Sequence, residues 1–129
     1  ASYGLSAGAW HGRDKALRVL SEQLAEALPE HHRRFLEGLQ LSAQFGDFFF
    51  CHAGIRPGVP LDAQSRQDLI WIRQEFLRDD GDHGAVVVHG HTPASEPEVR
   101  SNRINVDTGA VFGGPLTVLA LDGTDYRFL

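Results

Sequence analysis

The sequence has one cysteine, no methionine and no long apolar run. With Cys51 as the sole cysteine, an intramolecular disulfide is excluded. No stretch reaches the roughly 20 apolar residues that a membrane-spanning helix needs. Residues 1–10 show no basic region followed by an apolar core, which a secretory signal would have. These absences lead us to expect a chain without membrane contact and a cytoplasmic location.

Positive charge is also scarce. The chain has 12 Lys and Arg against 17 Asp and Glu, which gives a net charge of −5. This balance argues against nucleic acid as the main partner, because binding driven by counterion release needs a basic patch. Any phosphate would have to be held by local Arg, His or metal charge, since the overall field repels an anion.

Apolar spacing predicts helices in the first part of the chain. Leucines recur at helical intervals over residues 13–28, and Pro29 separates this helix from a second one over residues 30–39. A third helix is expected over residues 67–78.

The later part of the chain is richer in strand signals. Short apolar, aromatic or alternating runs predict strands at residues 47–51, 85–89, 103–107, 116–121 and 126–129. Helices followed by strands predict an α/β fold of the layered α+β kind. The 129 residues suffice for a single domain, with a helical segment over 1–44 and the sheet over 45–129.

Three of these strands end in a polar triplet that contains glycine. The triplets are His52-Ala-Gly54, Gly90-His91-Thr92 and Asp107-Thr-Gly109. A strand fixes the position of the side chain at its end, and glycine lets the backbone approach a ligand closely. Ligands at one edge of a sheet converge although they are far apart in sequence. We therefore expect a metal or phosphate site, with ordinary strand-to-loop exits as the alternative.

The histidines around Gly90 should play different roles. In an extended segment His89 and His91 point to opposite faces, so one is expected to bind the metal and the other to pack beside the site. The remaining ones are expected to be solvated; they are His11, His31, His32 and His83. Cys51 and His52 also point opposite ways, so Cys51 is interpreted as a small buried residue rather than a nucleophile.

Arg73 would lie on the apolar side of a continuous third helix. That side is formed by Leu69, Ile70, Ile72, Phe76 and Leu77. An isolated buried charge costs several kcal/mol, so the guanidinium needs an anion. The two alternatives are a carboxylate of the protein and the phosphoryl group of a ligand, which the arginine fork binds well.

Four motifs, in this order, resemble the second half of bacterial serine/threonine protein phosphatase-like metallophosphoesterases, in the calcineurin-like phosphoesterase superfamily. They are Phe50-Cys-His-Ala-Gly-Ile-Arg-Pro-Gly58, Asp68-Leu-Ile-Trp-Ile-Arg73, Val88-His-Gly-His-Thr-Pro93 and Asn105-Val-Asp-Thr-Gly109. The resemblance runs from about Phe45 to Gly123, and the helices of residues 1–44 resemble the family's variable insert. It implies the C-terminal half of a four-layer α-β-β-α sandwich.

The resemblance also implies a dinuclear metal site. Two divalent ions, Mn or alternatively Fe and Zn, would be bridged by a carboxylate and a hydroxide that attacks phosphorus. In that scheme His52 and His91 bind the second metal, and Arg73 holds the substrate phosphate. Asp107 would support the site from behind the ligands, and His89 would be a packed neighbour.

The family's first-half motifs do not occur in this sequence. Those motifs, Asp-x-His, Gly-Asp-x-x-Asp-Arg-Gly and Gly-Asn-His-Glu, supply the other metal ligands and the catalytic histidine. Two histidines alone cannot hold a metal pair. We therefore expect a fragment that contains no catalytic residue, is inactive alone and forms homo-oligomers through its uncovered sheet edge.

Three functions stay open at this point. The first is a phosphoric ester hydrolase whose substrate is a phosphorylated protein or a small phosphoester or nucleotide, the latter as a symmetrical dinucleoside tetraphosphatase. The second is a non-catalytic binding domain that kept the fold. The third, a structural zinc protein using His52 and His91, is disfavoured because the sequence has no further ligand cluster.

Overall fold

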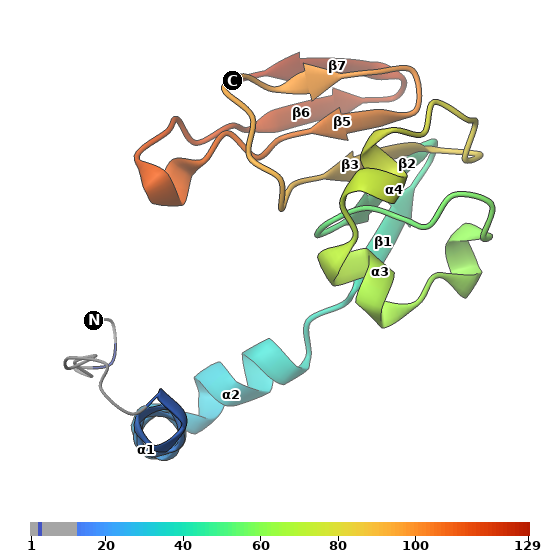
Figure 1. Cartoon of the computed structure of the whole chain (residues 1–129). Helices are drawn as coiled ribbons and strands as arrows, with labels where there is room; N and C mark the ends of the chain where they lie inside the picture. Colours follow the sequence, from blue (N-terminus) through green and yellow to red (C-terminus); the bar gives the residue numbers. More distant parts are fainter. Residues whose placement is uncertain (1–2, 4–12) are drawn as a thin grey trace. The chain divides into compact units, whose positions relative to one another are not determined.

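The computed structural model describes Tyr3 and residues 13–129, which fall into two compact units, 1–39 and 40–129. The first unit contains helices α1 (Arg13–Ala27) and α2 (Glu30–Glu37), both predicted from the sequence (Figure 1). Pro29 is the N-cap of α2, where its missing N–H leaves no helical hydrogen bond unmade. The expectations for His11 and for a signal sequence at residues 1–10 concern a segment that, apart from Tyr3, is outside the described residues. None of the described helices has the length and hydropathy of a membrane span.

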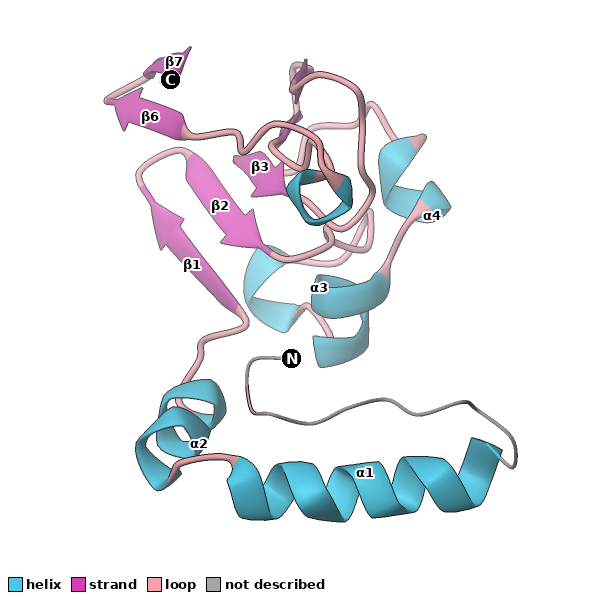
Figure 2. Cartoon of the chain, turned by 90° about the vertical axis from the view of Figure 1, so that its left-hand side faces the viewer, coloured by secondary structure: helices cyan, strands magenta, loops and turns pink. Residues whose placement is uncertain are grey.

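A five-stranded mixed sheet forms the centre of the second unit, in the order β1-β2-β3-β5-β4. Its strands β1, β2 and β3 are labelled in Figures 1 and 2. Its members are β1 (Ser42–Phe45), β2 (Phe48–Cys51), β3 (Val86–His89), β4 (Glu98–Val99) and β5 (Arg103–Asn105). The three central strands, β2, β3 and β5, are parallel, and the two outer strands run antiparallel to their neighbours. The central strands were predicted, but both outer strands were missed because they are short and only partly apolar.

Two cores cover the two faces of this sheet. On one face Phe49 and Val87 pack against Leu69, Ile72 and Phe76, which come from the segment with helices α3 and α4 described below. On the other face Phe48, Val88 and Ile104 pack against Leu119 and Leu121, which belong to the hairpin described next. This alternation follows from the period of two in a strand.

A hairpin provides a further layer. Strands β6 (Leu119–Asp122) and β7 (Asp125–Phe128) pair antiparallel in a separate two-stranded sheet. Gly123 has a φ of 59° in the tight turn between them, a backbone region that suits glycine. The layers of helices, mixed sheet and hairpin confirm the predicted α/β fold class.

The third helix is broken, which corrects a prediction. Residues Arg66–Trp71 form α3 and Gln74–Leu77 form α4, while Ile72 between them is extended with φ −59° and ψ 147°. Ile72 is 6% exposed, because this break turns its side chain into the core. Arg73 is exposed, so the argument that it is a buried charge on an apolar helix face was wrong.

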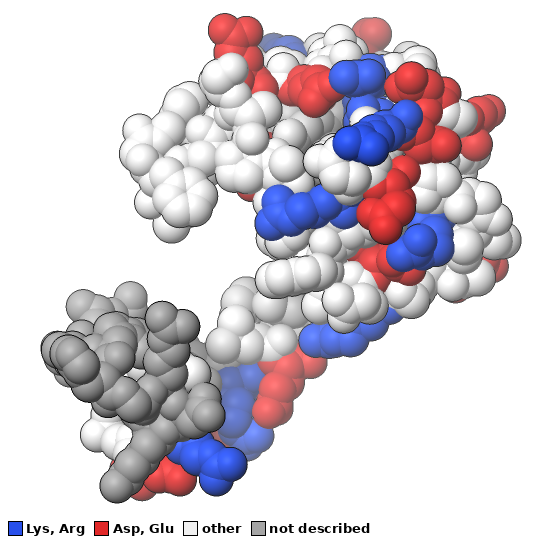
Figure 3. Space-filling model, in the orientation of Figure 1, with Lys and Arg blue, Asp and Glu red and all other residues white. Residues whose placement is uncertain are grey.

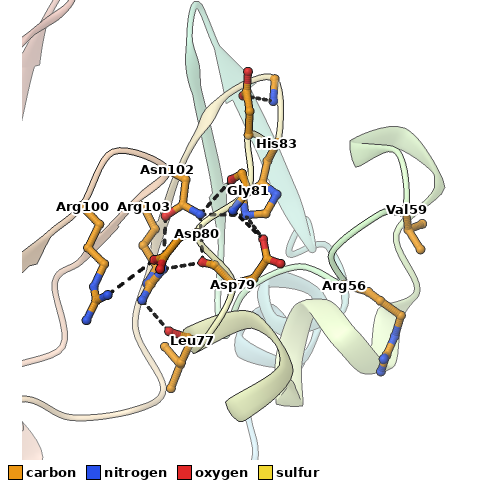
Figure 4. Close-up of polar contacts among 12 residues, drawn as sticks. Arg56, Val59, Leu77, Asp79, Asp80, Gly81, His83, Arg100, Asn102 and Arg103 are labelled. Atoms are coloured by element: carbon orange, nitrogen blue, oxygen red, sulfur yellow. Dashed lines mark hydrogen bonds and ion pairs between the residues drawn. The ribbon is translucent and has the colours of Figure 1, made fainter.

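A buried cation does exist in the fold, at Arg103 on β5, which is 1% exposed (Figure 4). Its Nη1 donates to the carbonyl of Asp79 at 2.9 Å and to Oδ1 of Asn102 at 3.1 Å, and its Nη2 donates to the carbonyl of Leu77. The ring of Phe76 lies 5.7 Å from the guanidinium carbon. Leu77 is the last residue of α4, where carbonyl groups lack helical partners. Arg103 therefore joins β5 to the end of α4.

His83 is also buried, although the sequence predicted a solvated residue. Its side chain is 4% exposed, and its Nε2 lies 3.3 Å from Nδ2 of Asn102. Asn102 Nδ2 also donates to the carbonyls of Asp79 and Gly81 (Figure 4). These bonds hold the turn after α4 against β5, and this non-local contact encloses the imidazole. His31 and His32 on α2 are exposed.

An apolar loop lies between β5 and β6 and contains the short helix η2 (Ala110–Phe112). Val111 is 87% exposed, Phe112 83% and Leu116 79%. Figure 3 shows no charged residue over η2 on the visible face. Exposed apolar surface of this kind favours association, and the expected homo-oligomer stays a prediction.

Asp68 should make the stability of this unit depend on pH. The hydrogen bond from Arg56, 2.6 Å from its carboxylate, is the largest cause that lowers the pKa of Asp68, with a further contribution from Ser65. A lowered pKa stabilises the folded state above the unfolded value of about 3.9. We expect Asp68→Asn to lower the melting temperature at pH 7, and this difference should shrink as the pH falls below about 4. Asp62→Asn, at an exposed carboxylate, is the control; an Asp68 effect that is constant from pH 7 to 3 would contradict this role.

Candidate functional site

The carboxyl ends of β2, β3 and β5 open at the same edge of the sheet, because these strands are parallel and adjacent. His52 follows β2, His91 follows β3 and Asp107 follows β5. The N–H of Gly90 donates to the carbonyl of His52 at 2.9 Å and joins two of these exits directly. The strand-end triplets picked out in the sequence thus meet at one place.

Two imidazole nitrogens face each other at this edge. His52 Nε2 and His91 Nδ1 lie 3.1 Å apart. The two rings are hydrogen-bonded to each other here, and the tautomers decide which ring donates. Neutral imidazole nitrogens are also ligands that divalent ions such as zinc take. The donor types therefore fit a metal.

The lowered pKa of His91 is consistent with metal binding. Burial is the largest cause that lowers the pKa of His91, and the charges of Arg73 and His52 lower it further. A lowered pKa favours the neutral imidazole, which is the form that binds metals. The second ring nitrogen of His91, Nε2, is buried and has no hydrogen-bond partner in the described part of the chain. A buried nitrogen without a partner is uncommon and requires an explanation.

The backbone at His91 is strained. Its φ is 68°, and no other non-glycine residue among those described has a positive φ. This conformation is costly for a side chain with a Cβ, and it is concentrated at functional sites. The N–H of Thr92 donates to the carbonyl of Gly90 at 2.8 Å, and Asn105 Nδ2 donates to the carbonyl of Thr92 at 2.9 Å. These bonds hold the turn in place against its strain.

His89 lies in the core rather than with the other two histidines. It is 2% exposed, and its ring meets that of Phe76 at 4.9 Å and 82°. Burial is the largest cause that lowers its pKa. Cys51 is half-buried, and burial raises the pKa of its thiol to about 12, which leaves it without thiolate character near neutral pH.

Arg73 reaches the site from the break between α3 and α4. Its Nη1 donates to the carbonyl of His91 at 3.2 Å and to Oγ1 of Thr92 at 3.1 Å. Both bonds come from Nη1; among the described side chains, those of Tyr3 and residues 17–129, none accepts from Nε or Nη2 and no carboxylate pairs with Arg73. The guanidinium is therefore anchored beside His91 with donors left for an anion.

Asp107 shapes the exit from β5. Its Oδ1 accepts the N–H of Gly109 at 3.0 Å, and its own N–H donates to Oδ1 of Asn105 at 3.0 Å. A side chain at Gly90 would bring a Cβ to 3.2 Å from the Cβ of Asp107. Over the described ranges, no three His, Cys, Asp or Glu residues form a group suited to a metal. Asp107 therefore supports the turns without completing a ligand set.

Three residues of the site were missed as such in the sequence. Thr92 accepts a hydrogen bond from the guanidinium of Arg73, and Asn105 donates to the Thr92 carbonyl and so holds the turn. The ring of Trp71 lies 5.3 Å from that of His91. All three are within the quoted motifs. A polar Asn within a strand pattern was the available signal for Asn105, whereas the position of Trp71 depends on the helix break.

Comparison with known proteins places this geometry in context. No family model matches the chain. Curated relatives include bis(5'-nucleosyl)-tetraphosphatase PrpE, named asymmetrical, from Bacillus thuringiensis, which is 57% identical over 84 residues covering 54% of this chain and 34% of the relative. The protein of that name from Bacillus cereus is 60% identical over the same shares. A crystal structure provisionally named diadenosine tetraphosphatase superposes with a TM-score of 0.66 at 21% identity, over 89% of this chain and 62% of that one.

These similarities point to the metallophosphoesterase superfamily, and the fold is that of the diadenosine tetraphosphatase structure. The chain spans about a third of the length of the curated relatives from the two Bacillus species. Those relatives are named asymmetrical, whereas a symmetrical dinucleoside tetraphosphatase was the alternative kept open from the sequence. The names of these relatives are those of nucleotide tetraphosphatases, which are phosphoesterase enzymes.

Proposed function

We propose that this chain is part of a metal-dependent phosphoric ester hydrolase, in which His52 and His91 bind the second metal and Arg73 binds the substrate phosphate. The single observation that carries the proposal is the convergence of these groups. The two ligand nitrogens lie 3.1 Å apart at the carboxyl edge of the sheet, and the guanidinium is bonded to the same turn. The strained φ of 68° at His91 supports a role beyond packing.

The chain's own groups have separable tasks in this proposal. A pair of divalent ions, Mn first and Fe or Zn as alternatives, would supply a Lewis acid and an activated water. His52 and His91 would hold one of these ions as neutral imidazoles. Arg73 would orient the phosphoryl group through its remaining N–H donors and stabilise charge that develops on it. Asp107 would hold the turn that follows β5, and His89 would pack beneath the ends of the strands.

The proposal includes a longer protein whose C-terminal half is this chain. Two imidazoles leave a metal short of its usual four or more ligands, and the relatives are about three times as long as the matched part. The missing half would supply the other ligands and the catalytic acid, so this chain alone would have no turnover. A cytoplasmic location is part of the same proposal.

The substrate would be a small nucleotide of the dinucleoside tetraphosphate class. The support for this choice is the name shared by the curated relatives. A phosphorylated protein is the weaker candidate, because it rests on the motif resemblance alone. We favour asymmetrical over symmetrical cleavage, because those relatives are named asymmetrical.

Zinc binding tests the metal site in this chain directly. We expect a nuclear magnetic resonance titration with Zn²⁺ to shift the imidazole signals of His52 and His91 together. His52→Ala or His91→Ala should weaken the binding about tenfold or more, since one of two ligands is lost. His31→Ala, at an exposed histidine of α2, is the matched control. Zinc binding that is unchanged after the loss of either site histidine would refute the metal site. The hypothesis of a non-catalytic binding domain would then be favoured.

A further inference from the structure

Trp71 is a large aromatic residue that lies largely in solvent beside the candidate site. It is 62% exposed at the end of α3. One side of its ring faces His91, with the ring centroids 5.3 Å apart and the planes tilted by 47°. Exposing an indole forgoes the burial that usually stabilises it, so an indole left largely in solvent beside a site indicates a binding role.

Trp71 and Arg73 flank the helix break, and both contact His91. The indole lies with its centroid 5.3 Å from that of the imidazole, and Nη1 of Arg73 donates to the His91 carbonyl at 3.2 Å. Ile72 points into the core and is 6% exposed, which anchors the segment between the two. The result is an apolar plane immediately beside a cation and an imidazole.

These two surfaces suit the two halves of a nucleotide. The guanidinium of Arg73, bonded to the His91 turn, offers donors to phosphate oxygens, whereas the indole offers a flat face. Every nucleobase has a π-face that stacks on an aromatic ring, whatever its hydrogen-bonding edge. An inorganic polyphosphate has no group that would use the indole.

We propose that Trp71 is the stacking platform for the nucleobase of a nucleoside oligophosphate whose phosphate lies at Arg73 and the histidine pair. The inference rests on the proposed function and adds the nucleoside subsite to it. Stacking of one base on an aromatic side chain corresponds to roughly a 5- to 100-fold gain in affinity. Trp71 thereby selects nucleotides over other phosphoesters, including phosphorylated peptides.

The test compares two probes on this chain in the presence of Zn²⁺: diadenosine tetraphosphate and inorganic tripolyphosphate. We expect calorimetry to show roughly 5- to 100-fold tighter binding of the nucleotide. Trp71→Ala should remove that difference and leave tripolyphosphate binding unchanged, and Trp71→Phe should keep part of it. The sequence has two tryptophans, so in a Trp10→Phe background the nucleotide alone should quench the fluorescence of Trp71.

Phe45→Ala is the matched control. Phe45 is 71% exposed, and it pairs with Phe48 at the amino end of β2, opposite the edge that carries His52. Equal affinity for the two probes, or a difference that survives Trp71→Ala, would overturn the stacking role. Arg73→Ala tests the phosphate role separately, because it should weaken the binding of both probes. Tripolyphosphate binding that Arg73→Ala leaves unchanged would contradict the proposed function rather than the stacking role. If neither probe binds to a longer protein that contains this chain, both proposals fail.

Discussion

Replacing Arg73 by alanine is expected to lower kcat/KM by roughly 10²–10³-fold in a longer enzyme that contains this chain, the scale of losing one preorganised contact to the transition state. Arg73→Lys should recover little, because the fork that binds two phosphate oxygens is lost. Stability should change little, since the side chain is exposed and its hydrogen bonds in the described part of the chain are to the carbonyl of His91 and the hydroxyl of Thr92.

The measurement combines steady-state kinetics with a melting curve for each variant. Arg78→Ala is the control, since Arg78 is an exposed arginine that follows the end of α4. It should leave both kcat/KM and the melting temperature nearly unchanged. An Arg73→Ala protein that unfolds more easily but turns over normally per folded molecule would show that Arg73 is structural.

A large loss of stability is expected from Gly54→Ala. A Cβ at Gly54 would lie 2.2 Å from Cδ1 of Phe76, and the φ of Gly54 is 145°. Phe76 is fully buried and its ring contacts that of His89 at 4.9 Å, so it has little room to move. Overpacking and backbone strain together should lower the free energy of unfolding by about 3–5 kcal/mol.

Urea unfolding measures this effect, and the chain offers a control that separates its two causes. Gly58 also has a positive φ, 76°, but a Cβ there would meet nothing within 4 Å. Gly58→Ala should therefore show strain alone, about 1 kcal/mol. Phe76→Leu in the Gly54→Ala protein should recover part of the loss, which a double-mutant cycle would measure. Equal losses at the two glycines would rule out the steric contact with Phe76.

Local patterns in the sequence were sufficient for the elements with strong periodicity. The run of apolar residues before His52 predicted β2, and the run before Gly90 predicted β3. The same reasoning anticipated that their ends converge, because parallel neighbours share an edge. The strand ends thus indicated His52 and His91 without knowledge of the crossover connections.

Tertiary contacts determined what the sequence could not predict. The apolar spacing from Leu69 to Leu77 is compatible with one helix, yet burying Ile72 and fixing Arg73 to the His91 turn requires an extended residue between two short helices. Arg73 therefore lies near the site for a reason other than the one inferred. His83 was mispredicted for a similar reason, since Asn102 reaches it from 19 positions away.

The order of the parallel strands also has a kinetic consequence. His52 and His91 are 39 positions apart, and their approach needs β2 and β3 to pair side by side with the α3–α4 crossover in place. Such non-local pairing is slow, and sheet-rich domains of this kind typically fold on the order of milliseconds to seconds. No local segment brings the two imidazoles together before that step. The histidine pair therefore forms only when β2 and β3 are paired, so any change that separates these strands should also separate the two imidazoles.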